Sequence, residues 1–122
     1  MTKKKLLVVD DEEGFLEIVK DYFVSQGYEV IIASNVDEAL KNFGRFLPKV
    51  VLLDFNLPIV SGEKILPLFQ SIQPTVRVIV LTGCIGEEVE ERFKGLGYFA
   101  YFEKSGLKLE DVRNKVEEAF NY

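Results

Sequence analysis

Short apolar runs rich in β-branched residues alternate along this chain with longer segments whose apolar residues repeat every three or four positions. The runs at residues 6–9, 30–33, 50–53 and 78–81 are too short for helices and are bounded by polar residues or glycine, which is typical of buried strands. A weaker fifth run covers residues 100–102. This alternation predicts a parallel sheet with helical crossovers, and it constrains the fold more than any other feature.

Five segments have the helical period, at residues 15–23, 36–43, 65–72, 89–96 and 109–120. One side of each is apolar, as expected for helices that pack on a sheet. With right-handed crossovers, the pattern predicts an α/β, doubly wound fold: a five-stranded parallel sheet of order 2-1-3-4-5 with five helices on both faces. Ser34 is the predicted N-cap of the second helix. No repeat or linker interrupts the 122 residues, so we expect one domain over 1–122.

The composition excludes several kinds of chemistry and partner. The chain has no histidine, which excludes Ser-His and Cys-His nucleophile pairs and histidine-ligated zinc. Cys84 is its one cysteine, so an intrachain disulfide is excluded. The net charge of −5 argues against contact with nucleic acid or membrane, and the basic run at residues 3–5 is interpreted as a solvated tail. Apolar runs are too short for a membrane span or a signal peptide, and we therefore expect a cytoplasmic protein.

Polar side chains follow the predicted strands at their carboxyl ends. They are Asp10 and Asp11 after the first strand, Asp54 at the end of the third, Thr82 at the end of the fourth, and Glu103 and Lys104 at the end of the fifth. Ligands of open parallel sheets bind at this edge, where the strand order reverses. Because the first and third strands are neighbours in the predicted order, we expect three carboxylates to share one space with a hydroxyl and an ammonium group nearby.

Such a group of carboxylates must take up protons or a cation, because each anion raises the pKa of the others. Oxygen ligands alone select a hard divalent ion, of which Mg²⁺ fits best and Mn²⁺ is the alternative. A carboxylate oxygen beside the metal can attack phosphorus and form an aspartyl phosphate, while Lys104 and the Thr82 hydroxyl neutralise and position the phosphoryl group. Taken singly, each residue could also be a helix cap, a turn residue or an exposed edge lysine. These structural explanations account poorly for the occurrence of the whole set at the strand ends.

Four motifs, in this order, resemble those of the receiver domains of two-component response regulators. They are Val8-Val9-Asp10-Asp11, Asp54-Phe55-Asn56-Leu57-Pro58 with Gly62, Leu81-Thr82-Gly83, and Tyr101-Phe102-Glu103-Lys104. The resemblance covers essentially the full chain and implies a chemotaxis-regulator-like receiver with a flavodoxin-like fold. It also implies a phosphoprotein of a phosphorelay that catalyses only its own phosphorylation and dephosphorylation and is otherwise no enzyme.

The resemblance assigns roles to individual residues. Asp54 would be the phosphoacceptor and, with Asp11, a direct ligand of Mg²⁺. Asn56 would bind the ion through its backbone carbonyl and Asp10 through water.

Two further roles concern signal relay. Thr82 and Lys104 would bind the phosphoryl oxygens, and Tyr101 would change rotamer when Thr82 moves. This would relay the change to the output face, which is the predicted fourth and fifth helices with the last strand. An edge-strand aromatic packed on a helix is the other interpretation of Tyr101. The donor would be a phosphohistidine of a sensor histidine kinase or a histidine phosphotransfer protein, because this chain has no histidine to donate from. An output partner or effector domain would receive the signal.

Two positions depart from the family pattern. Ser105 stands where proline usually follows the lysine through a cis peptide, so the bond here is expected to be trans or strained. Cys84 lies two residues after Thr82, at a position that affects access of water to the phosphate, and it equally fits a small buried residue.

Two other functions fit these residues less well. An aspartate-nucleophile phosphatase of the haloacid dehalogenase kind has the pattern Asp-x-Asp-x-Thr after its first strand, whereas this chain has Asp10-Asp11-Glu12-Glu13-Gly14. A flavodoxin-like cofactor carrier needs backbone N–H groups that hold a phosphate after that strand, and four consecutive acidic residues repel phosphate instead.

Overall fold

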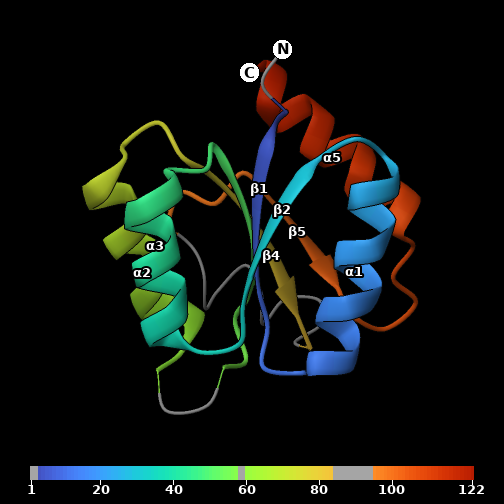
Figure 1. Ribbon diagram of the computed structural model, residues 1–122. Helices are drawn as coiled ribbons and strands as arrows, with labels where there is room; N and C mark the ends of the chain where they lie inside the picture. The colour runs from blue at the N-terminus through green and yellow to red at the C-terminus, as the bar shows by residue number, and fades with distance from the viewer. Residues whose placement is uncertain (1–2, 58–59, 84–94) are drawn as a thin grey trace.

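The computed structural model describes residues 3–57, 60–83 and 95–122. In chain order, its elements are β1 (Lys5–Val9), α1 (Glu13–Ser25), β2 (Glu29–Ala33), α2 (Val36–Phe46), β3 (Val50–Asp54), α3 (Gly62–Ile72), β4 (Arg77–Thr82), β5 (Ala100–Glu103) and α5 (Leu109–Asn121). The strands form one parallel sheet of order β2-β1-β3-β4-β5, which confirms the predicted topology. Helices α2 and α3 cover one face of this sheet, and α1 and α5 cover the other (Figure 1).

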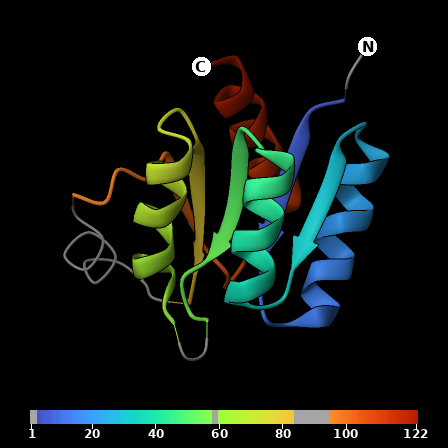
Figure 2. The same ribbon diagram turned by 60° about the vertical axis from the view of Figure 1, so that its left-hand side comes forward.

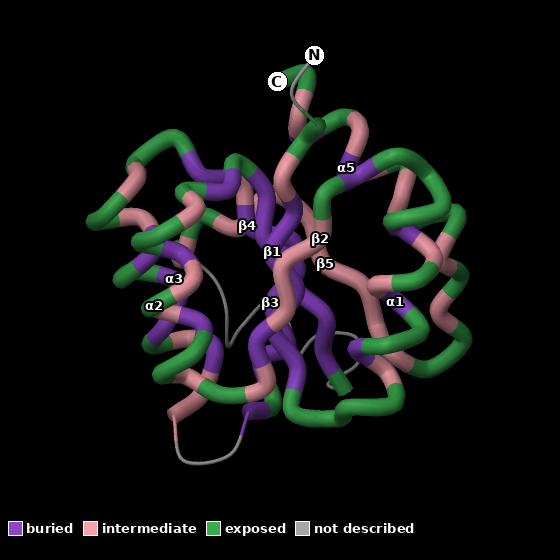
Figure 3. The backbone as a smooth tube through the Cα atoms, in the orientation of Figure 1, coloured by how far each residue is buried: buried purple, intermediate pink, exposed green. Residues whose placement is uncertain are grey.

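Successive residues of the central strands point to opposite faces of the sheet and so build two hydrophobic cores. In β3, Val51 and Leu53 pack with α2 and α3, while Val50 and Leu52 pack with α1 and α5. All four side chains are fully buried, and the burial colouring follows the central strands (Figure 3). Because helices cover both faces, these strands have runs of consecutive apolar residues rather than an apolar residue at every second position.

Four of the five predicted helices lie in the described ranges. The predicted helix at residues 89–96 falls outside them, apart from its last two positions. The predicted N-cap of α2 was wrong by one residue, since Asn35 is the cap and its side chain accepts the Glu38 N–H at 2.9 Å. Ser34 instead donates its backbone N–H and its hydroxyl to the Glu38 carboxylate, at 3.0 and 2.8 Å. These two bonds lower the pKa of Glu38.

All five strands end at the same edge of the sheet, because they are parallel. The register places Val9 of β1 opposite Leu53 of β3, and Asp54 opposite Leu81 of β4. The residues that follow β1 and end β3 therefore meet at this edge, while both ends of the chain lie at the opposite edge (Figure 2). Within the described ranges, no helix has the length and apolar character that a membrane span requires.

Candidate functional site

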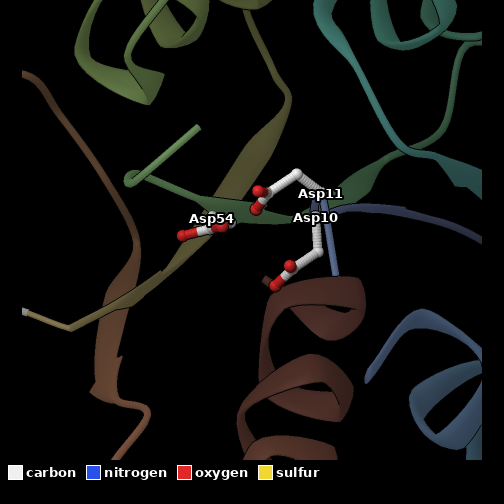
Figure 4. A group of neighbouring side chains, drawn as sticks. All are labelled: Asp10, Asp11 and Asp54. Atoms are coloured by element: carbon white, nitrogen blue, oxygen red, sulfur yellow. The ribbon is translucent and has the colours of Figure 1, made fainter. Parts of the chain in front are cut away.

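Three carboxylates meet at the carboxyl edge of the sheet, as predicted. Asp10 follows β1 and Asp54 ends β3, and both are buried, with exposed fractions of 0% and 1%. Asp11 is exposed beside them. One ligand oxygen from each residue lies within 4.8 Å of the others, and the side chains lie side by side (Figure 4).

Local turns fix the two buried carboxylates in place. One oxygen of Asp10 accepts the backbone N–H of Glu12 at 2.9 Å, and one oxygen of Asp54 accepts that of Asn56 at 2.9 Å. A side-chain oxygen that binds the N–H two residues later is the usual way in which aspartate starts a turn. Each carboxylate therefore uses one oxygen for its own loop and presents the other, Oδ2, to the shared space.

Lys104 reaches this space from the end of β5. Its ammonium Nζ lies 2.8 Å from Asp10 Oδ2 and 3.4 Å from Asp54 Oδ2. The backbone N–H of Lys104 donates to the carbonyl of Thr82 at 2.8 Å, which ties the lysine to the end of β4. The peptide bond to Ser105 is trans, since the described residues contain no cis peptide. The lysine thus reaches the carboxylates with serine in the position after it.

Burial and the neighbouring charges together set the pKa values of the two buried carboxylates and Lys104. Burial, and secondly the charge of Asp10, raise the pKa of Asp54 to about 6, against the hydrogen bond from Asn56 and the charge of Lys104. Burial also raises the pKa of Asp10, although its contact with Lys104 opposes this. Burial alone would lower the pKa of Lys104, but its close contact with Asp10 and the charge of Asp54 hold that pKa above its usual value. One ammonium does not balance three carboxylates, so the group favours a further positive charge.

The carboxylates fit a divalent cation. All donors are oxygens, and oxygens that share one Mg²⁺ lie at most about 4.2 Å apart, given metal–oxygen distances of roughly 2.1 Å. A set within 4.8 Å needs only a small contraction or one bridging water to reach that spacing. Within the described residues, the buried Asp10 Oδ2 has no hydrogen-bond partner, and the Lys104 ammonium contacts it as an ion pair at 2.8 Å. Asp10, Asp11 and Asp54 together can hold a divalent metal.

Thr82 lies beside this group on the neighbouring strand. It ends β4 fully buried, and its register partner on β5 is Glu103, the residue before Lys104. Asn56 is exposed in the loop after β3, where its backbone N–H fixes Asp54. The structure therefore brings six of the seven predicted site residues, all except Tyr101, to one edge.

Tyr101 lies further from the carboxylates along β5. Its register partner is Val80 of β4, and alternation places its side chain on the same face of the sheet as Thr82. The ring is half-buried against the core under α2 and α3, and it meets the Tyr98 ring edge to face at 5.9 Å. This position agrees with either predicted interpretation of Tyr101.

Two residues at the site had no predicted role. The carboxylate of Glu12 lies 3.4 Å from the Lys104 ammonium, and that ammonium lies 5.0 Å from the centre of the Phe15 ring. Glu12 stood out only as one of four consecutive acidic residues, and Phe15 only as part of the apolar side of α1. Neither pattern indicates a partner on β5, which is distant in sequence.

A receiver module is the class of protein that this fold and this acidic group define. Over residues 6–117 the chain matches the response regulator receiver domain, and it belongs to that family. It is therefore a phosphoacceptor module of two-component signalling rather than a conventional enzyme.

Individual relatives agree with this assignment. The chain is 30% identical over 118 residues to sporulation initiation phosphotransferase F of Bacillus subtilis, covering 97% of this chain and 94% of that protein. A CheY-like receiver domain protein from Methanospirillum hungatei superposes with a TM-score of 0.90 at 28% identity, covering 98% and 95% of the two chains. A response regulator from Burkholderia pseudomallei, solved with a phosphorylated aspartic acid, a calcium ion and citrate, gives a TM-score of 0.82 at 28% identity, covering 97% and 72%. Several other curated relatives are longer, and the chain spans between 22% and 39% of their length.

Proposed function

We propose that Asp54 is the residue that accepts the phosphoryl group. The observation that carries this proposal is the geometry of its Oδ2, which lies in the carboxylate group 3.4 Å from the Lys104 ammonium. Asp10 Oδ2 is held by the same ammonium at 2.8 Å, so the oxygen of Asp54 is the less constrained of the two buried candidates. With a pKa of about 6, Asp54 is ionised at neutral pH and can act as a nucleophile.

In the proposed transfer, Asp54 Oδ2 attacks the phosphorus of a phosphohistidine. An oxygen–phosphorus bond forms, the phosphorus–nitrogen bond breaks, and the departing imidazole nitrogen keeps the electron pair and takes up a proton. Lys104 neutralises charge on the phosphoryl oxygens, and the Thr82 hydroxyl donates a hydrogen bond to one of them. Such transfers depend mainly on positioning and charge neutralisation, which these residues supply. The module catalyses this reaction and the later hydrolysis only on itself.

A divalent cation, Mg²⁺ with Mn²⁺ as the alternative, would bind directly to Asp11, Asp54 and the Asn56 carbonyl, and through water to Asp10. When bound, it would supply the positive charge that holds donor phosphate beside the acidic group. The Burkholderia protein, which holds a calcium ion and a phosphorylated aspartic acid, supports the use of a divalent cation.

The donor in this proposal is a sensor histidine kinase or a histidine phosphotransfer protein, in the cytoplasm. Two observations support it. The family is that of response regulators, and the Bacillus subtilis relative, which matches over 94% of its own length, is named a phosphotransferase. Movement of Thr82 and a rotamer change of Tyr101 would then relay the phosphorylated state to the output face.

Incubation with acetyl phosphate and Mg²⁺ tests the acceptor without a kinase. Intact-mass spectrometry should show one added phosphoryl group, which alkaline treatment removes, and Asp54→Asn should gain none. Asp111→Asn is the matched control, because Asp111 is an exposed aspartate in the first turn of α5. Equal labelling of Asp54→Asn and Asp111→Asn would show that the acceptor lies elsewhere.

A further inference from the structure

A groove with four lysines lies at the edge of the sheet opposite the carboxylates. Lys5 begins β1, Lys3 and Lys4 precede it, and Lys49 comes directly before β3. Because the strands are parallel, residues before β1 and before β3 meet at the same edge, near both ends of the chain (Figure 1). The groove has a volume of about 370 Å³, and we call it the basic groove.

The basic groove has more positive charge than its own acidic neighbour can neutralise. Lys4 is paired with Glu117 at 3.0 Å, and Glu117 also accepts a hydrogen bond from the Tyr28 hydroxyl. Lys3, Lys5 and Lys49 form no ion pair within the described residues. The excess is local, because the chain as a whole has a net charge of −5. The predicted solvated tail is therefore wrong for Lys5, which begins β1, and for Lys4, which is paired with Glu117, whereas Lys3 is exposed as predicted.

Apolar side chains form the walls between these lysines. Phe46 and Phe120 line the groove, and the Lys4 ammonium lies 5.6 Å from the centre of the Phe120 ring. Leu47 is 49% exposed there and has a left-handed backbone, with φ at 47°. A leucine rarely adopts that conformation, and exposed leucine between lysines offers a contact for an apolar side chain.

A second hollow continues the same surface. It shares Lys49 and Phe120 with the basic groove and adds Arg77, whose guanidinium lies 5.1 Å from the centre of the Tyr122 ring. A surface that combines cationic side chains with apolar and aromatic ones therefore extends from the start of β1 to the start of β4.

We propose that the basic groove binds an acidic segment of a partner protein through carboxylates and one apolar anchor residue. The spaced lysines match carboxylates along a peptide, and Leu47 with the two phenylalanine rings matches an apolar side chain. A nucleic acid or an anionic lipid surface fits less well, because the net charge of −5 repels an extended polyanion. The groove lies at the far end of the strands from Asp54, so the partner can bind whether or not Asp54 is phosphorylated.

Fluorescence anisotropy tests this proposal with a labelled peptide of alternating Glu and Asp residues around one central leucine. The parent should bind it with an affinity that falls as salt increases, and replacing the leucine of the peptide by serine should weaken binding. The double variant Lys3→Glu with Lys49→Glu should weaken it by at least about tenfold, as expected when two charges in a complementary interface are reversed. Lys41→Glu on α2 makes the same kind of change outside the groove and should bind within about twofold of the parent.

A further variant and two competing probes test the apolar contact and the kind of ligand. Leu47→Ser should weaken the acidic peptide without changing net charge, and melting temperatures of all variants should confirm that they fold. A single-stranded oligonucleotide and vesicles containing phosphatidylserine are the competing probes. Absence of peptide binding, equal binding by the double variant and Lys41→Glu, or tighter binding of either competing probe would each overturn the proposal.

Discussion

Gly62, the first residue of α3, packs directly against Phe55, the residue that follows Asp54. A Cβ atom added at Gly62 would lie 2.4 Å from Cδ1 of Phe55 and 2.8 Å from its Cα, distances that side chains do not tolerate. The backbone N–H of Gly62 also donates to the Phe55 carbonyl at 3.3 Å. The start of α3 therefore packs closely against the loop that directly follows the proposed acceptor, Asp54.

Gly62→Ala should consequently affect both stability and phosphorylation. Overpacking of this kind costs about 1–3 kcal/mol, and a displaced Phe55 moves the Asn56 N–H that binds Asp54. Gly44→Ala is the control, because Gly44 lies inside α2 with nothing within 4 Å of an added Cβ, and it should stabilise by about 0.5–1 kcal/mol. Denaturant unfolding and labelling by acetyl phosphate measure the two effects. A Gly62→Ala protein with parental stability and labelling rate would contradict the packing argument.

Mg²⁺ should stabilise the protein through the carboxylate group. Ligand linkage gives about 2.7 kcal/mol at a free concentration of one hundred times the dissociation constant. Asp11→Asn should remove most of this gain, whereas Asp21→Asn, at an exposed position on α1, should retain it. Melting temperatures with Mg²⁺ and with a chelator provide the measurement. The assignment of the metal to this edge fails if the two variants respond alike.

The metal-free protein should become less stable as the pH rises through about 6, relative to Asp54→Asn. The pKa of Asp54 is raised in the folded state, so the folded protein binds this proton more tightly than the unfolded chain does. The resulting stabilisation is present below about pH 4 and is lost as the pH rises through the folded pKa, a change on the order of 2–3 kcal/mol. Unfolding free energies between pH 4 and pH 8, in chelator, should therefore favour Asp54→Asn increasingly at high pH. A difference between the two proteins that stays constant with pH would refute the raised pKa.

Phe15 should assist phosphorylation by holding Lys104. A lysine above an aromatic ring gains about 0.5–1 kcal/mol at a partly exposed site, so Phe15→Leu should slow labelling by acetyl phosphate roughly two- to fivefold, while Phe15→Tyr should not. Phe46→Leu removes a similar contact with Arg45 at the far end of α2 and should leave the rate unchanged. Equal rates for Phe15→Leu and the parent would mean that the carboxylates alone position the ammonium.

Much of the fold was predictable because each element has a local pattern of its own. Buried parallel strands need uninterrupted apolar runs, and the runs at residues 50–53 and 78–81 are buried throughout in β3 and β4. The cap of α2 was predicted one residue early because serine and asparagine are both good caps and stand next to each other.

The site was predictable for a different reason. The carboxyl ends of parallel strands must meet, so Asp10, Asp54 and Lys104 follow from strand order alone. The contact of Phe15 with Lys104 and that of Gly62 with Phe55 depend on side-chain directions between elements, which no local period encodes. For the same reason the lysines at the start of the chain resembled a tail until β1 and β3 placed them together with Lys49.

The backbone hydrogen bond from Lys104 to the Thr82 carbonyl has a consequence for how a signal leaves the acceptor. It joins the ends of β4 and β5 at the two residues that would hold the phosphoryl oxygens. When Thr82 or Lys104 moves, the two strand ends must therefore either shift together or separate. Separation breaks this hydrogen bond, at a net cost of about 1 kcal/mol. The amide proton of Lys104 distinguishes the two routes, because a joint shift keeps it protected from exchange with solvent and a separation releases it.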